Sequence, residues 1–177
     1  EFIYSINLCL NSTGGDIDET FAIIKLIQSD IGVSTVVDAG NVCTSECAYL
    51  FMSGMGFLGH GTEAARMLHV DGVLQFVAPR PEHIDKKELL DAEVDFGKAV
   101  REVARLLRTT YQHTIGKTTL PRSLVSAILK SNPQRGLRLE RIEQAKNWGI
   151  ELFGGIGPAN ITRLRIKNIC QIYAKVK

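Results

Sequence analysis

The chain has 177 residues, enough for one domain with a single hydrophobic core. Hydrophobic residues make up 45% of it and charged residues 23%, which excludes extensive disorder. The net charge of +2 gives no nucleic-acid footprint, and no run of about 18 apolar residues could cross a bilayer as a helix. The composition is that of a globular protein.

The first part of the chain alternates strand-like and helix-like segments. Residues 2–10 are apolar and β-prone, and they run into a polar, glycine-containing turn at 11–15. Asp16 or Asp18 can cap the helix that follows. That helix has an apolar stripe of Phe21, Ile24, Ile27 and Ile31 and ends at Gly32.

Three further segments complete this alternation. The β-branched run 33–37 predicts a strand, and residues 65–70 predict another. Between them, residues 44–52 begin with polar capping residues and continue as a short apolar helix. The order of strand, helix and strand predicts parallel pairing, right-handed crossovers and an α/β fold.

The second half of the chain is more helical. A charged segment with two prolines, 79–88, leads into a long amphipathic helix at about 84–112. Helices around 120–129 and 140–148 follow, and then a last strand. Residues 161–177 carry five Lys and Arg residues and no acid, and their alternation of apolar and basic residues favours a half-buried strand over a phosphate or lipid contact.

Two glycines stand between the first strand and the first helix. Glycine lets the backbone turn tightly and leaves its N–H groups open to the oxygen of a phosphate or an oxyanion. Gly14 and Gly15 match neither a P-loop nor the glycine fingerprint of dinucleotide-binding proteins. A turn of purely structural purpose uses the same residues, so the pair alone assigns no function.

A serine stands where a loop enters the short apolar helix. Ser45 is either the N-cap of that helix or a nucleophile whose oxyanion is held by the amide of Glu46 and the helix dipole. A nucleophilic serine needs a base, and His69 in an apolar strand is either that base or a hydrogen-bonded core residue. The remaining histidines lie in segments that suit surface or capping roles: His60, His83 and His113.

The cysteines do not indicate a metal site. There are four, too few for a disulfide scaffold: Cys9, Cys43, Cys47 and Cys170. Cys43 and Cys47 have no second ligand pair at zinc-finger spacing.

The order of these motifs is more specific than any one of them. N-S-T-G-G, a helix, V-S-T-V-V-D-A-G-N-V-C-T-S-E-C-A-Y-L-F-M-S-G and A-R-M-L-H together resemble the proteolytic subunit of the Clp protease, and most closely a bacterial branch with a C-x-S-x-C serine. The resemblance covers about residues 3–155. It implies a crotonase-like spiral of β-β-α units in one domain over 1–177, without the family's first strand and helix, and a helical handle insertion at 79–116.

The resemblance also implies a serine peptidase. Ser45 inherits the role of nucleophile and His69 that of general base, while Gly14, Gly15 and Glu46 supply amides of the oxyanion hole. His69 would take the Ser45 proton as the hydroxyl attacks a peptide carbonyl, and then protonate the leaving amine before water releases the acyl-enzyme. The mechanism requires a hydrogen bond of about 2.6–3.2 Å between Ser45 and His69, and no metal or organic cofactor.

The chain departs from the family in the acid of the triad. The family has an aspartate after its handle helix, whereas residues 113–139 contain neither Asp nor Glu. Asn132 or Ser131, or a water, would have to orient His69 instead. Without the acid the imidazole tautomer is poorly fixed, and activity is expected to be reduced.

A second departure is the pair of cysteines on either side of the nucleophile. The i, i+4 relation of Cys43 and Cys47 on a helical turn is near disulfide reach, and a bridge would rigidify the loop that carries Ser45. Two small buried hydrophobic side chains are an equally good interpretation. A bridge would favour a periplasmic or exported protein, and free thiols a cytoplasmic one.

Two other functions fit parts of the sequence. A crotonase-like protein that binds acyl-CoA thioesters would use Gly14 and Gly15 without needing Ser45 and His69. A peptide-binding pseudo-protease or assembly module fits the missing aspartate. As partners we expect a peptide or protein substrate and further copies of the chain in a homo-oligomer; no unfolding partner is identified, and no nucleic acid is expected.

Overall fold

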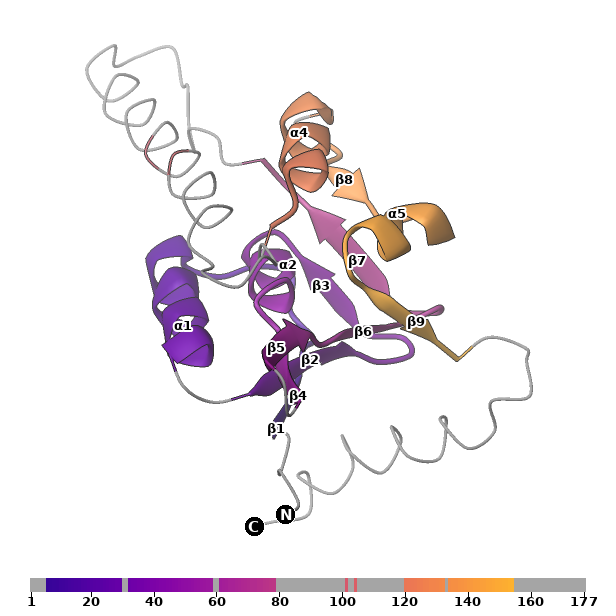
Figure 1. Cartoon of the computed structure of the whole chain (residues 1–177). Helices are drawn as coiled ribbons and strands as arrows, with labels where there is room; N and C mark the ends of the chain where they lie inside the picture. The colour runs from indigo at the N-terminus through magenta and orange to yellow at the C-terminus, as the bar shows by residue number, and fades with distance from the viewer. Residues whose placement is uncertain are drawn as a thin grey trace.

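The computed structural model describes residues 6–29, 32–58, 61–78, 101, 104, 120–132 and 134–154, and within these ranges the chain is a mixed α/β structure (Figure 1). Apart from Arg101 and Ala104, the predicted handle insertion at 79–116 lies outside the described residues, as do the basic tail at 161–177 and the start of the predicted strand 2–10.

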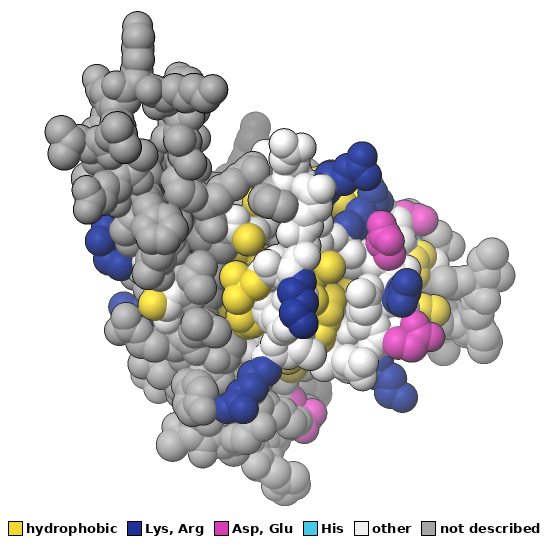
Figure 2. Space-filling view, turned by 90° about the horizontal axis from the view of Figure 1, so that it is seen from above, with side chains coloured by type: hydrophobic (Ala, Val, Ile, Leu, Met, Phe, Trp, Pro, Cys, Tyr) yellow, Lys and Arg dark blue, Asp and Glu magenta, His cyan; other side chains and the backbone are white. Residues whose placement is uncertain are grey.

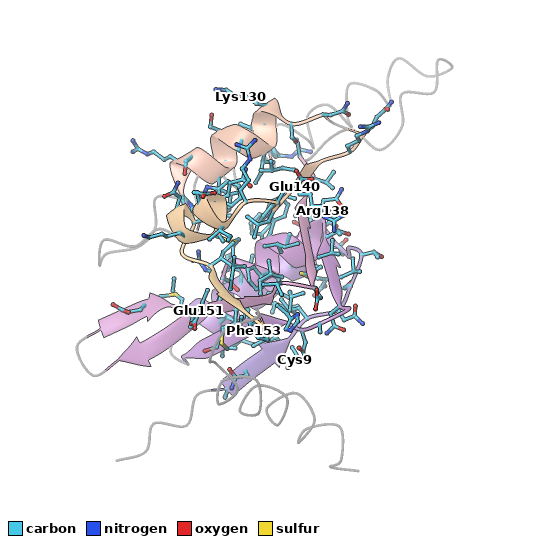
Figure 3. The ribbon with its side chains drawn as sticks, turned by 90° about the vertical axis from the view of Figure 1, so that its right-hand side faces the viewer. Cys9, Lys130, Arg138, Glu140, Glu151 and Phe153 are labelled. Atoms are coloured by element: carbon cyan, nitrogen blue, oxygen red, sulfur yellow. A yellow bond between two sulfur atoms is a disulfide. The ribbon has the colours of Figure 1, made fainter. Side chains whose placement is uncertain are left out.

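The larger sheet is built from four parallel strands in the order β1-β2-β6-β9. These are β1 (Ile6–Cys9), β2 (Val33–Val37), β6 (Arg66–His69) and β9 (Glu151–Phe153). Every residue of β2 is buried, because this strand is central and both its faces are covered. Figure 3 labels residues of the two edge strands, Cys9 on β1 and Glu151 and Phe153 on β9.

The smaller sheet continues the strands of the larger one. Its strands are β3 (Val42–Thr44), β7 (Val73–Phe76) and β8 (Leu137–Arg138), with β3 parallel to β7 and β8 antiparallel to it. The chain passes from the larger to the smaller sheet twice, through the turns 38–41 and 70–72, which lie side by side. An antiparallel hairpin of β4 (Met55–Leu58) and β5 (Gly61–Ala64) leads back to the larger sheet.

The helices whose bounds lie within the described residues pack against the sheets (Figure 1): α1 (Ile17–Ser29), α2 (Glu46–Phe51), α4 (Arg122–Lys130) and α5 (Ile142–Asn147). Asp16, rather than Asp18, begins α1: its carboxylate accepts hydrogen bonds from the N–H groups of Asp18 and Glu19 at 2.8 and 3.0 Å. None of the helices in the described ranges has both the length and the apolar character needed to cross a membrane.

The short helix α2 lies at the centre of the core. Tyr49, Phe51 and Met52 are at most 2% exposed and pack with Phe76 of β7. The far wall of the core comes from α4 and from the segment that follows α5: Leu124, Val125, Ile128, Trp148 and Ile150. The outer side of α4 faces solvent, and basic side chains and apolar patches share the face of the molecule seen from above (Figure 2).

The ring of Phe76 is expected to be one of the largest single contributors to stability. It is fully buried, with its centroid 6.2 Å from that of Tyr49 and 6.4 Å from that of Trp148. We expect Phe76→Ala to lower the free energy of unfolding by about 3–5 kcal/mol in urea denaturation, because it removes these contacts and leaves a cavity. Ile142→Ala is the control: the side chain is 72% exposed, and a change within about 0.5 kcal/mol is expected. Equal losses for both variants would contradict the described core.

Arg66 of β6 links the larger sheet to the C-terminal end of α5 through a hydrogen bond. Its guanidinium is 4% exposed and donates from Nη1 to the Trp148 carbonyl at 3.0 Å, just before the chain enters β9. The buried Nε has no hydrogen-bond partner within the described residues. Burial lowers the pKa of Arg66 to about 10, so the side chain stays charged at neutral pH.

Candidate active site

Backbone hydrogen bonds join the turn of residues 11–15 (the glycine turn) to the end of β3, which leads into the turn around Ser45 (the serine turn). The N–H of Ser12 donates to the Val42 carbonyl at 2.7 Å, and the N–H of Thr44 donates to the Ser12 carbonyl at 3.0 Å. The backbone of Ser12 thus pairs in parallel with β3. As a result Gly14 lies against the serine turn: a Cβ atom added to it would stand 3.6 Å from the Ser45 Cβ.

Ser45 has an uncommon backbone conformation. Its φ of 56° and ψ of −126° make it the only non-glycine residue with positive φ among those described. Its N–H donates to the Gln75 carbonyl and its own carbonyl accepts from Ala48, each at 3.0 Å, so the turn is held on both sides. The hydroxyl makes no capping hydrogen bond, although Ser45 occupies the N-cap position of α2. A strained turn that presents an uncapped hydroxyl is typical of a nucleophile.

The candidate oxyanion amides differ in their present partners. The N–H of Gly14 donates to the Ser12 hydroxyl, and that of Gly15 donates to the Glu46 carboxylate, both at 3.3 Å. No acceptor in the described part of the chain faces the N–H of Glu46. The Gly15 amide is thus occupied by the Glu46 side chain, whereas the Glu46 amide makes no hydrogen bond to a described residue.

A disulfide closes the loop around Ser45. Cys43 on β3 and Cys47 on α2 are bridged, with their Cα atoms 5.2 Å apart and Ser45 between them. Both cysteines are buried, so the bridge lies beneath the turn, on its core side.

His69 ends β6 in a closely packed slot. The residue is 3% exposed, its ring meets Phe153 edge-on at 5.0 Å, and Gly154 lies against Nε2. A Cβ atom added to Gly154 would fall 2.0 Å from that nitrogen. Nδ1 accepts a hydrogen bond from the Asp71 N–H at 3.0 Å, which places the proton of neutral imidazole on Nε2.

The expected hydrogen bond between Ser45 and His69 does not occur in the described part of the chain. The strand register explains why. His69 comes before the turn that opens β7, whereas Ser45 follows β3 at the opposite end of the β3–β7 pair. Three residues of extended chain separate these ends by about 10 Å. The β7 residue beside Ser45 is Gln75, whose side-chain amide donates to the Arg135 carbonyl and cannot act as a base.

The candidate orienting residues lie in different places. The Asn132 carboxamide accepts from the N–H groups of Gln134 and Arg135 within its own turn, at 2.8 and 3.3 Å, and the Ser131 hydroxyl donates to the Ile128 carbonyl at 2.7 Å. Their part in a triad stays a prediction.

Among the described residues the carboxylate of Asp71, to which the family resemblance does not point, lies close to His69. The Oδ2 of Asp71 lies 3.6 Å from Nδ1, and its side chain is 73% exposed. The signal in the sequence was an aspartate two residues after the histidine, in the turn His69-Val70-Asp71-Gly72. Among the described residues no group of three His, Cys, Asp or Glu side chains could hold a metal ion.

Comparison with solved structures identifies the fold. The chain is similar to a point mutant of ClpP1 from Listeria monocytogenes, with a TM-score of 0.56 and 17% identity over 86% of this chain and 75% of that one. The catalytic domain of the ClpP protease from Plasmodium falciparum matches with a TM-score of 0.46 and 18% identity over 87% and 70% of the two chains. No model of a known protein family matches the sequence, and a search of curated proteins finds no relative.

The chain therefore has a ClpP-like α/β fold. At this level of identity the similarity extends to the fold alone, and the chemistry of the site has to be argued from its own residues.

Proposed function

We propose that this chain is a serine-type hydrolase that cleaves peptide bonds, with Ser45 as its nucleophile. One observation carries the proposal: the strained, uncapped Ser45 lies against the Gly14–Gly15 turn within a ClpP-like fold. Positive φ in a serine at a strand-to-helix junction costs on the order of 1–3 kcal/mol, which a purely structural turn could avoid with glycine.

The proposed reaction is acyl transfer. The Ser45 oxygen attacks the carbonyl carbon of a peptide bond while His69 accepts the hydroxyl proton, and the N–H groups of Glu46 and Gly15 stabilise the oxyanion. His69 then donates that proton to the leaving amine, and water attacks the acyl-enzyme by the same route. Proton transfer requires a conformation in which the His69 imidazole reaches Ser45 with Nε2 unprotonated. The ring proton is then on Nδ1, where the Asp71 carboxylate, rather than Asn132, accepts its hydrogen bond.

A peptide-binding module without catalysis is the second candidate. It is favoured by the separation of His69 from Ser45 and by the hydrogen bond that the Gly15 amide makes to Glu46. Such a module would use the same two turns to hold an extended peptide without cleaving it.

Labelling with a fluorophosphonate probe tests the proposal. We expect covalent modification of Ser45 in the native protein, none in Ser45→Ala, and at least about a hundredfold slower labelling in His69→Ala. Ser123→Ala on the exposed side of α4 is the control and is expected to label like the native chain. Absence of labelling in the folded native protein would favour the binding module, and unchanged labelling of His69→Ala would remove His69 from the mechanism.

The proposal includes three features of the wider molecule. These are a handle helix within 79–116, a crotonase-like spiral of one domain over 1–177, and assembly into a homo-oligomer. The bridged Cys43–Cys47 pair supports a periplasmic or exported location, because disulfides persist in oxidising compartments.

A further inference from the structure

The Glu46 carboxylate occupies the place where a substrate oxygen would bind. Its Oε2 accepts the Gly15 N–H at 3.3 Å, and a Cβ atom added to Gly14 would meet the same oxygen at 2.9 Å. Glu46 directly follows Ser45 and is the first residue of α2. Its side chain reaches the Gly14–Gly15 turn, while its backbone N–H is the other proposed donor to the oxyanion. A substrate carbonyl can reach the Gly15 amide only after this carboxylate leaves.

The charge of Glu46 opposes the proposed reaction. A carboxylate beside an oxyanion raises the energy of that oxyanion, since both groups are negative and compete for one donor. Within the described ranges no Lys, Arg or His forms an ion pair with Glu46. The neighbouring chain adds further acids: Asp16 follows Gly15 directly, and Asp18 and Glu19 occupy the first turn of α1. A cationic substrate could therefore supply the charge that pairs with the Glu46 carboxylate.

We propose that Glu46 determines substrate specificity by selecting peptides with Lys or Arg next to the scissile bond. The inference rests on the proposed function of Ser45. A cationic side chain beside the nucleophile forms an ion pair with Glu46 and draws the carboxylate away from Gly15, which frees that N–H for the carbonyl oxygen. An uncharged side chain gives no such compensation, so the hole stays occupied.

Two phosphonate diphenyl esters that modify serine nucleophiles test this inference. They differ only in the side chain beside the phosphorus, lysine in one and the uncharged norleucine in the other. We expect the native protein to react with the lysine reagent roughly tenfold faster. Glu46→Gln keeps the size of the side chain but removes its charge, and it is expected to bring the ratio of the two rates close to one, mainly by accelerating norleucine. Glu143→Gln on the exposed face of α5 should keep the native ratio.

The possible outcomes separate this inference from the function on which it rests. If Ser45 reacts but the native protein treats both reagents alike, the inference is wrong and the hydrolase proposal stands. The same holds if Glu46→Gln accelerates both reagents equally, because Glu46 would then occupy the hole without selecting a substrate. If neither reagent modifies Ser45 in any variant, both the hydrolase proposal and this inference are wrong.

Discussion

Replacing Gly154 with alanine is expected to lower the free energy of unfolding by roughly 3 kcal/mol. Two costs combine at this position. The φ of 89° disfavours any side chain by about 1–2 kcal/mol. In addition, the new Cβ would fall 2.0 Å from Nε2 of His69, and forcing a methyl group into a filled core costs about 1–3 kcal/mol. Urea denaturation of the native and variant proteins measures the loss.

Gly40 provides a matched control for the backbone term. Its φ of 74° is similar, but a Cβ added there would meet nothing within 4 Å, so Gly40→Ala should cost about 1–2 kcal/mol only. A double-mutant cycle isolates the collision: in a His69→Ala background the ring is gone, and Gly154→Ala should cost no more than Gly40→Ala.

The cycle also reports on the proposed mechanism. A large coupling between residues 69 and 154 locates the His69 ring in the slot beside Phe153. In the proposed mechanism the ring must leave this slot to reach Ser45. Zero coupling would mean that the ring does not occupy this slot, and it would contradict the described position of His69.

The regular elements were predictable because each carries a strong local pattern. The strand at 33–37 coincides with β2, and the helices around 120–129 and 140–148 correspond to α4 and α5 within a few residues. Phe21, Ile24 and Ile27 are buried as the helical stripe predicted. In these segments burial follows sequence periodicity, and tertiary context only confirms a local preference.

The smaller sheet could not be predicted in the same way. Its strands β3, β7 and β8 have two to four residues each, too few for an alternating pattern to be recognised. They are stabilised by pairing between segments about 30 or more residues apart, as between Val42 and Val73 or Gln75 and Arg138. Non-local pairing of this kind leaves no signature in any one segment.

The two halves of the candidate site show the same contrast. Gly14 and Ser45 come together because the chain after β1 pairs in parallel with β3, and each of the two residues follows one of these paired segments. The order of the motifs indicated this arrangement. The position of His69 relative to Ser45 depends on the turns 38–41 and 70–72 and on the β3–β7 pair, which add length between the two residues. The number of residues between two motifs does not show in which direction the intervening chain runs. It therefore could not predict how far His69 lies from Ser45.

Opening the disulfide that spans Ser45 is expected to affect both stability and the proposed reactivity of Ser45. The bridge joins residues separated by 4 in sequence, and closing so short a loop stabilises the folded chain by roughly 2 kcal/mol in the chain-entropy model. The same bridge spans Ser45, whose positive φ stores on the order of 1–3 kcal/mol that the flanking contacts must offset. We therefore expect Cys43→Ala/Cys47→Ala to unfold at lower urea concentration and to label at Ser45 about tenfold more slowly, the factor that 1.4 kcal/mol of relaxed turn would cause.

Comparing the native protein with the double alanine variant, each with and without dithiothreitol, separates the effect of this bridge from that of the other cysteines. Cys9 is also disulfide-bonded, so reduction of the native protein opens more than the Cys43–Cys47 pair. If the bridge around Ser45 governs labelling, reduction should slow the native protein to the rate of the double alanine variant and leave that variant almost unchanged. A double variant that labels as fast as the native protein would show that the hydrogen bonds of Ser45 to Gln75 and Ala48 hold the turn without the sulfur bridge.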